Sequence, residues 1–464
     1  MKLKGQTRIL KGIQSLSEQS FVGLRLIMQL PGVLKMAMSR KKMLLFFMAI
    51  TTLSFLLHQS GHLTWYTKPF HFGCFHQRAT KEKRTEIVFL KTHKTASSTV
   101  QNILFRFAEK NNITVALPIH GCDHQFCYPG NFSKKFVHPY TIPPHIITNH
   151  MRFNFAELQQ LMPNNSVYVT ILREPVAMFE SLFSYYNQHC QSFKRVPNNS
   201  MEIFLSNPLK YYKADERYSM YAHNTLVFDL GGDKDHSPLD EEYINSFIKQ
   251  IESIFSLVMI AEYFDESLIL LKDLLSWDLD DILYVKLNMR SKESKHNISS
   301  DIPQKVQKWN AFDAKLYEYF NNTFWKKVQS FGPDCMEKEV QLLNQSVQKL
   351  MQDCFGGWPQ LRSSAQIKNK ELRPWQPSSE VSIIGYDLPV NSNSVATNYC
   401  LKLVMPEVQY SRYLLRKATI KIRKKIPYHQ MRKPIVSLQK QKSAARVNHL
   451  VRNSPVKYRT KKNK

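Results

Sequence analysis

The chain has 464 residues, 43% hydrophobic, 12% aromatic and 22% charged, which excludes a disordered protein and suffices for one large α/β domain or two smaller ones. The net charge is +27, but residues 1–42 and 416–464 together carry +25, so the middle of the chain is nearly neutral. These ends are expected to be two solvated basic tails, or tails attracted to anionic membranes or glycans. Nucleic-acid binding is not expected, because the tails lack interleaved aromatic residues and a recognisable module.

The first predicted element is a membrane anchor. Met43–Leu57 is an uncharged run of 15 residues directly after the basic residues 40–42. Fifteen helical residues span only about 22 Å, so residues up to Leu63 are expected to complete the crossing of a thin early secretory membrane. The charge pattern predicts a cytosolic tail at 1–42, a signal anchor at 43–63 and a stem at 64–85. A cleavable signal peptide is the alternative, but the run starts late and no clear A-x-A site follows.

Glycosylation sequons after the anchor support a lumenal location for the rest of the chain. Their asparagines are Asn112, Asn131, Asn164, Asn198, Asn297, Asn321 and Asn344. All seven cysteines also follow the anchor, and an oxidising lumen permits disulfides. Cys122 with Cys127 and Cys335 with Cys354 are plausible local pairs, and the odd number leaves at least one thiol free or intermolecular.

The folded domain is expected to begin at Glu86 and to alternate strands with helices. The expected strands are Ile87–Leu90, Ile146–Thr148, Val167–Leu172 and Leu257–Ala261. The expected helices are Thr99–Glu109, Asn154–Leu161 with an Asn154/Glu157 capping box, Pro175–Asn187, Glu266–Leu275 and most of Asn310–Gln352. This alternation predicts an α/β fold, with a mostly parallel central sheet flanked by helices, in one lumenal domain at 86–415. Pro377–Ser394 is turn-rich, and the basic tail at 416–464 is expected to be disordered.

The segment Ile87–Thr99 (IVFLKTHKTASST) has the character of an anion-binding loop. A strand ends, a polar loop follows and a helix begins, so successive backbone N–H groups form a cradle for an anion. Lys94 adds a positive charge, and the hydroxyls of the following residues add donors. The loop has no glycine and lacks G-x-x-x-x-G-K-[ST], which argues against a triphosphatase. The expected anion-binding residues are Lys94, Thr95, Ala96, Ser97, Ser98 and Thr99.

A second anion site is expected after the strand Val167–Leu172. Arg173 stands at the carboxyl end of this strand, where α/β sheets bind ligands, and Ser181 lies in the helix that follows. An arginine fork with a hydroxyl suits a second phosphate. Two phosphate sites at two strand ends are what 3′-phosphoadenosine 5′-phosphosulfate (PAPS) needs.

Several separated phrases resemble one family. KTASST resembles the 5′-phosphosulfate loop of sulfotransferases, and the spacing of Arg173 and Ser181 resembles their 3′-phosphate motif. FLKTHKTASSTVQNILFRF, NHMRFNF, ILREPVAMFESLFSYY, FDESLILLKDLL and LVMPEVQY together resemble the galactose 3-O-sulfotransferases, which include cerebroside sulfotransferase. The resemblance covers about residues 86–415, and the basic tail departs from it. It implies a P-loop-like sulfotransferase sheet, a type II protein of the Golgi membrane, and sulfuryl transfer from PAPS to the 3-hydroxyl of a β-galactose on a glycolipid or glycoprotein.

The reaction requires charge stabilisation and a base. The resemblance implies that Lys94 stabilises the leaving phosphate, and no metal is expected because Lys and Arg supply positive charge. His150, which follows the strand Ile146–Thr148, is the preferred base, and His93 in the donor loop is the second candidate. Either histidine could instead have a structural role.

The acceptor site is weakly marked in the sequence. The expected partner is a β-galactoside glycan, and Arg152, Phe153, Tyr185 and Tyr186 are candidates for lining its cleft, although each is as well explained as a packing residue. The alternatives are another Golgi carbohydrate sulfotransferase, a lumenal kinase, or an inactive lectin-like relative. No magnesium-binding carboxylate pair stands at the strand ends, which argues against a kinase, and intact Lys94 and Arg173 argue against an inactive protein. A homo-oligomer is left open.

Overall fold

The computed structural model describes residues 82–291, 299–378, 381–388 and 394–425. Its centre is a sheet of five parallel strands in the order β2-β3-β1-β4-β5. The strands are β1 (Ile87–Leu90), β2 (Val115–Ala116), β3 (Ile146–Ile147), β4 (Val167–Leu172) and β5 (Leu257–Ile260). All their residues are buried, as expected for apolar, β-branched strands covered on both faces. The predicted α/β fold with a mostly parallel central sheet is therefore confirmed.

The strand register brings the chemically interesting loops together. Ile87 of β1 pairs with Ile146 of β3 and Val167 of β4, so these three strands run side by side. The chain forms β1, β2 and β3 on one side and then crosses β1 to form β4, which creates a switch point in the strand order. Ligands bind outside the carboxyl ends of parallel strands at such a point.

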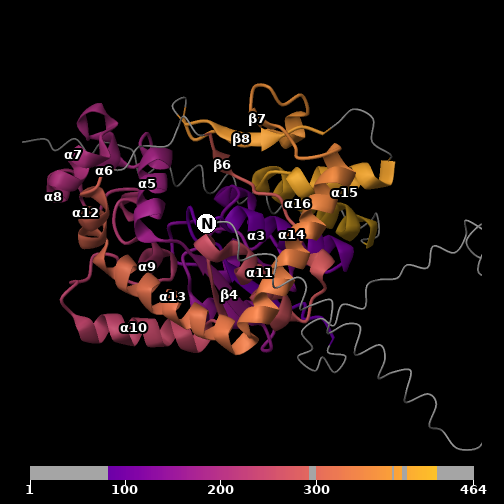
Figure 1. The fold of residues 1–464 in the computed structure, drawn as a ribbon, viewed down its shortest axis with the longest axis horizontal. Coiled ribbons are helices and arrows are strands. Elements are labelled where there is room, and N and C mark those ends of the chain that lie inside the picture. The colour runs from indigo at the N-terminus through magenta and orange to yellow at the C-terminus, as the bar shows by residue number, and fades with distance from the viewer. Residues whose placement is uncertain (1–81, 292–298, 379–380, 389–393, 426–464) are drawn as a thin grey trace, which may run out of the picture. The chain divides into compact units, whose positions relative to one another are not determined.

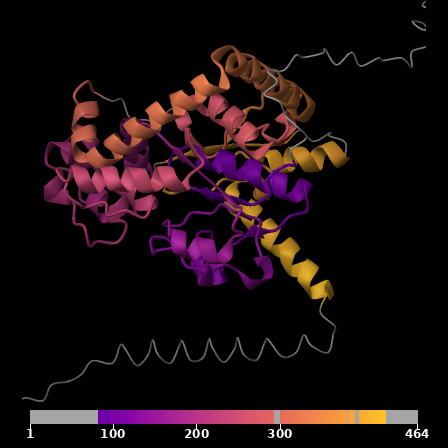
Figure 2. The same ribbon diagram turned by 90° about the horizontal axis from the view of Figure 1, so that it is seen from below.

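Helices surround the sheet (Figures 1 and 2). Their bounds are α3 (Ser97–Lys110), α4 (Phe155–Leu161), α5 (Pro175–Tyr186), α6 (Gln191–Lys194), α7 (Met201–Ser206), α8 (Pro208–Tyr211), α9 (Thr225–Asp229), α10 (Glu241–Ile254), α11 (Phe264–Leu275), α12 (Ile302–Trp309), α13 (Ala311–Phe331), α14 (Pro333–Phe355), α15 (Ser394–Val404) and α16 (Glu407–Lys425). Helices α11 and α13 pack on β5, α12 packs on α5 and α7, and α15 and α16 pack on α3. The last two contacts bring the end of the described chain to its beginning.

A small antiparallel sheet lies above α3 in Figure 1. It consists of β6 (Met289–Arg290), β7 (Leu361–Ser363) and β8 (Ile383–Tyr386), in the order β6-β8-β7. Gly385 allows close packing of β8, because a Cβ atom there would lie 2.9 Å from Ile367 Cδ1 and 3.1 Å from Pro374 Cδ, and these side chains would have to shift. The sequence indicated only turns over Pro377–Ser394, because strands this short carry too little pattern to recognise.

Most predicted elements of the central sheet agree with the structure to within about two residues, but two local expectations are wrong. Asn154 precedes α4 without a side-chain cap, and Glu157 instead accepts from the Lys134 N–H and the Ser133 hydroxyl, so the capping box does not form. The expected start of the tail at 416 falls inside α16, which continues to Lys425 and projects from the domain in Figure 2.

The expected anchor at 43–63, most of the stem and residues 426–464 lie outside the described residues. Within the part of the chain that is described, no helix is both long and apolar enough for a bilayer crossing.

One of the two predicted disulfide pairs is observed. Cys122 is bonded to Cys127, as predicted. Cys354 is bonded to Cys400 of α15 instead of Cys335, which is itself disulfide-bonded. Cys190 is a buried free thiol, so the expectation of at least one unpaired cysteine is confirmed. The pairing of Cys354 could not be read from sequence spacing because the two half-cystines are 46 residues apart.

Candidate active site

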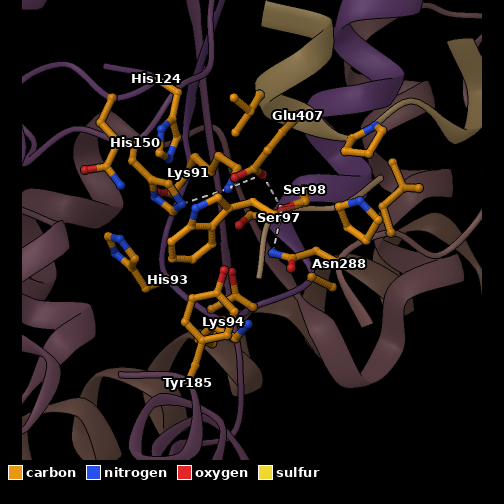
Figure 3. A pocket seen from close by; sticks show the side chains of 18 of the residues that line it. Lys91, His93, Lys94, Ser97, Ser98, His124, His150, Tyr185, Asn288 and Glu407 are labelled. Atoms are coloured by element: carbon orange, nitrogen blue, oxygen red, sulfur yellow. Dashed lines mark hydrogen bonds and ion pairs between the residues drawn. The ribbon is translucent and has the colours of Figure 1, made fainter. Parts of the chain in front are cut away.

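A cavity of about 970 Å³ opens at the carboxyl-terminal edge of the central sheet. It brings together the residues that the sequence assigned to donor binding and catalysis (Figure 3). Those residues are His93, Lys94, Thr95, Ala96, Ser97, Ser98, Thr99, His150, Arg173 and Ser181. They come from the ends of β1, β3 and β4 and from α5, because parallel strands deliver their carboxyl ends to the same edge.

The loop between β1 and α3 is built largely by its own hydroxyl groups. Lys94 and Ala96 adopt left-handed backbone conformations, with φ of 59° and 63°. The Ser97 and Thr95 hydroxyls donate to the Thr92 carbonyl at 2.7 and 3.3 Å, which folds the loop tightly without glycine. Ala96 caps α3 without a side-chain hydrogen bond, so the first N–H groups of the helix can bind an anion.

Lys94 lines the cavity and has a strongly lowered pKa. Its Nζ lies 3.7 Å from the centre of the Tyr185 ring, a cation–π contact. Burial lowers the pKa of Lys94 well below its usual value, and the neighbouring cations Arg290, Arg173 and Lys91 lower it further. A bound anion would oppose this lowering, because a nearby negative charge favours the charged form of the lysine. The cavity therefore fits a phosphate-bearing donor at this point.

Arg173 and Ser181 form a second cationic region beside the loop. Arg173 Nη1 donates to the Lys94 carbonyl at 3.0 Å, which ties the end of β4 to the donor loop. Ser181 is buried in α5 and lines the same cavity. Arg290 of β6 also lines it, and its Nη1 donates to Glu180 at 2.9 Å. No sequence pattern indicated Arg290, because it comes from the small sheet.

His150 is engaged at both ring nitrogens. Its Nδ1–H donates to the Lys91 carbonyl at 2.8 Å, and its Nε2 accepts from Lys91 Nζ at 2.8 Å. Burial and the nearby His93 and Lys91 hold the pKa of His150 well below its usual value, so it stays neutral. This arrangement disfavours His150 as the base, because its lone pair is already occupied by Lys91.

His93 has the arrangement that a base requires. Its Nδ1–H donates to the Asp229 carboxylate at 2.9 Å, and its backbone N–H donates to the same carboxylate at 2.8 Å. Tyr128 donates its hydroxyl to Asp229 at 2.7 Å. The carboxylate fixes the tautomer, and Nε2 is then a buried acceptor without a hydrogen-bond partner. The ring stacks on His150 at 3.9 Å between centroids, which holds its plane.

Glu407 of α16 lines the cavity, although it lies far from the donor loop in the sequence. Its Oε2 lies 3.0 Å from Lys91 Nζ and accepts from the Ser98 hydroxyl at 2.5 Å (Figure 3). Burial alone would raise the pKa of Glu407, but Lys91, His124 and the Ser98 hydroxyl outweigh it and hold the pKa at about 2. Glu407 therefore holds Lys91 Nζ next to His150 Nε2. Asp229, Glu407 and Lys91 were not predicted, because their roles depend on partners 59 to 316 positions away.

The expected acceptor residues divide into two groups. Tyr185 and Tyr186 line the cavity. Arg152 and Phe153 do not: Arg152 donates to the Gly232 carbonyl at 3.0 Å, and Phe153 is buried in the core. Tyr186 stacks on Tyr221 at 3.6 Å between centroids, and both rings meet the edge of His93. This aromatic wall was not predicted beyond α5, because Tyr221 comes from a separate loop.

Comparison with known proteins gives consistent matches over most of the chain. Residues 25–418 match the family model described as Galactose-3-O-sulfotransferase. The chain is 57% identical to Galactose-3-O-sulfotransferase 3 of Bos taurus over 384 residues, which are 82% of this chain and 90% of that one. It is 39% identical to Galactosylceramide sulfotransferase of Homo sapiens over 332 residues, 71% and 78% of the two chains. It is 38% identical to Galactose-3-O-sulfotransferase 2 of Mus musculus, with 71% and 84% covered.

Proposed function

The chain belongs to the galactose-3-O-sulfotransferase family, and from that premise we propose that it transfers a sulfuryl group from PAPS to the 3-hydroxyl of a β-galactose on a glycolipid or glycoprotein glycan. The observation that carries this proposal is one cavity lined both by Lys94, which can bind an anion, and by His93, whose ring is hydrogen-bonded to Asp229. The lysine and arginine side chains suit an anionic donor, and the imidazole suits a hydroxyl acceptor that must lose a proton.

The groups on the donor side divide between the two phosphates of PAPS. PAPS, when bound, supplies a sulfuryl group joined to phosphate through a bond whose cleavage leaves extra charge on that phosphate. Lys94 and the first N–H groups of α3 hold the 5′-phosphate and stabilise this charge, while Arg173 and Ser181 hold the 3′-phosphate. These groups are already positioned by the loop and by the Arg173–Lys94 hydrogen bond, so little reorganisation is needed during the reaction.

On the acceptor side, His93 Nε2 takes the proton of the galactose 3-hydroxyl as its oxygen attacks sulfur. Asp229 stabilises the imidazolium that forms and keeps Nδ1 protonated before the reaction. His150 positions the His93 ring by stacking on it, and Lys91 in turn holds His150 through a hydrogen bond. His93 replaces His150 as our preferred base because its lone pair is unoccupied.

The direct test is transfer of labelled sulfate. Full-length protein in detergent, given PAPS with radioactive sulfur and a panel of β-galactosides, is expected to label galactose at the 3-hydroxyl. The matching α-galactosides and a 3-O-methyl β-galactoside are the controls, and the latter should take no label at that sugar. If no β-galactoside is labelled and a hexosamine or uronic acid is labelled instead, the proposed acceptor sugar is wrong.

We also propose that the protein is a single-pass type II protein of the Golgi membrane. Exposed sequon asparagines at 112, 131, 164, 198 and 344, with Asn321 half-buried, support a lumenal domain, as do the two disulfides that lie wholly within the described residues. Protein made in animal cells is expected to run faster on a gel after treatment with peptide-N-glycosidase, and Asn112→Gln should remove one step of that shift. An unglycosylated protein in the cytosolic fraction would contradict this topology.

A further inference from the structure

Trp375 presents an indole to the active-site cavity. Trp325, Trp358 and Trp375 are the exposed tryptophans among the described residues, and of these only Trp375 lines the cavity. Its side chain is 49% exposed. An indole left half-exposed on the wall of a ligand cavity is an apolar surface that a ligand can cover.

The ring is held in place although it is exposed. It packs beside Tyr185 and His189, with centroids 5.9 and 6.2 Å away, and the His189 plane is inclined to it by 28°. His189 Nε2 in turn donates to the Pro377 carbonyl at 2.9 Å. Prolines at 374 and 377 restrict the backbone on both sides of Trp375.

The neighbouring residue adds a further constraint. Gln376 donates to the Ile383 carbonyl at 2.9 Å and accepts from the Ile383 N–H at 2.8 Å, which fixes this segment to β8. A ligand that covers the indole therefore meets a surface that is already ordered, so it loses little free energy in arranging it.

Trp375 packs against the end of α5. The phosphate-binding residues precede or lie within the first two turns of α5, at Arg173 and Ser181. Trp375 instead packs on Tyr185 at the end of α5. The Tyr185 ring contacts Lys94 Nζ, which is assigned to the phosphate that loses the sulfuryl group, and it also contacts Tyr186, whose centroid lies 6.2 Å from that of His93. A chain of aromatic rings thus connects the indole to the base that receives the acceptor proton.

We propose that the Trp375 indole stacks on the apolar face of the acceptor galactose and sets the affinity for the acceptor. The axial 4-hydroxyl of galactose leaves one face of the sugar largely hydrocarbon, which an indole can cover, while the opposite polar groups meet His93. This inference rests on the proposed function, because it assigns a residue to the acceptor of that reaction. It assigns no role in donor binding to Trp375.

The test compares Trp375→Ala and Trp375→Phe with Trp358→Ala in the full chain. Trp358 is a matched control because it is more exposed, at 72%, and does not line the cavity. Trp375→Ala is expected to raise the KM for N-acetyllactosamine about tenfold or more and to leave the KM for PAPS within about twofold. Trp375→Phe should fall between, and Trp358→Ala should match the wild type.

A second measurement does not depend on turnover. N-acetyllactosamine added to the protein with adenosine 3′,5′-bisphosphate should change the tryptophan fluorescence, and this change should be lost in Trp375→Phe but kept in Trp358→Phe. A raised KM for PAPS with an unchanged acceptor KM would overturn the proposal and assign the indole to the adenine ring. Unchanged KM values and an unchanged fluorescence response would also overturn it. Failure of the proposed function is a separate result, in which the wild type labels no galactoside at all.

Discussion

Lys94→Ala is expected to lower kcat at least about a hundredfold, equivalent to roughly 2.7–4 kcal/mol of lost transition-state stabilisation. Lys94 is half-buried in the loop before α3, next to the position assigned to the 5′-phosphate, and a bound anion favours its charged form. The measurement is initial-rate kinetics with PAPS and a β-galactoside. Lys349→Ala, which removes an exposed lysine of α14 outside the cavity, should leave the rate unchanged.

The low pKa of Lys94 gives this prediction a pH dependence. Burial and the cations Arg290, Arg173 and Lys91 favour the neutral amine in the free enzyme, whereas a bound anion favours the ammonium. The KM for PAPS should therefore rise with pH well below the usual lysine pKa, as the amine loses its proton. Lys94→Arg, which stays charged, should bind PAPS with little pH dependence over that range. A KM that is equally insensitive to pH in both proteins would contradict this role.

His93→Ala is expected to lower kcat by about 10²–10⁴ and to leave donor binding nearly intact. Removal of the imidazole removes the acceptor for the hydroxyl proton but leaves Lys94, Arg173 and the N-terminus of α3 in place. Asp229→Asn should cause a comparable loss, because an amide can hold the ring in the opposite tautomer, with Nε2 protonated. Thermal stabilisation by adenosine 3′,5′-bisphosphate measures donor-site binding independently of turnover.

His150→Ala separates the two histidines. It is expected to lower the rate by a smaller factor than His93→Ala, because it removes a stacking partner and the acceptor for Lys91 Nζ. Exposed His120, outside the cavity, provides the control substitution His120→Ala, which should behave as wild type. A larger loss for His150→Ala than for His93→Ala would reassign the base to His150.

The sequence predicted those parts of the fold that have a local cause. Val167–Leu172 and Ile87–Leu90 are continuous apolar strands, and both were predicted with the observed bounds, because burial on both faces leaves this pattern in the sequence. The strands β2, β6, β7 and β8 have two to four residues each and no such pattern, so they were missed. The capping box at Asn154 failed because Ser133 and Lys134, which are distant in sequence, compete for Glu157.

For the site, the sequence by itself determined the family, the donor loop and the residues expected to hold two phosphates, because these lie in short continuous motifs at the ends of β1 and β4. Only the tertiary structure decided which histidine has an unoccupied lone pair. Asp229, 136 positions from His93, accepts the hydrogen bond of His93 Nδ1–H, which leaves the lone pair on Nε2. Nε2 of His150 instead accepts a hydrogen bond from Lys91. The tertiary structure also placed Glu407 and Trp375, from the end of the domain, beside a loop near its beginning. Hydrogen bonds and ring contacts between such distant residues arise only when the sheet and its flanking helices have assembled, and no local pattern encodes them.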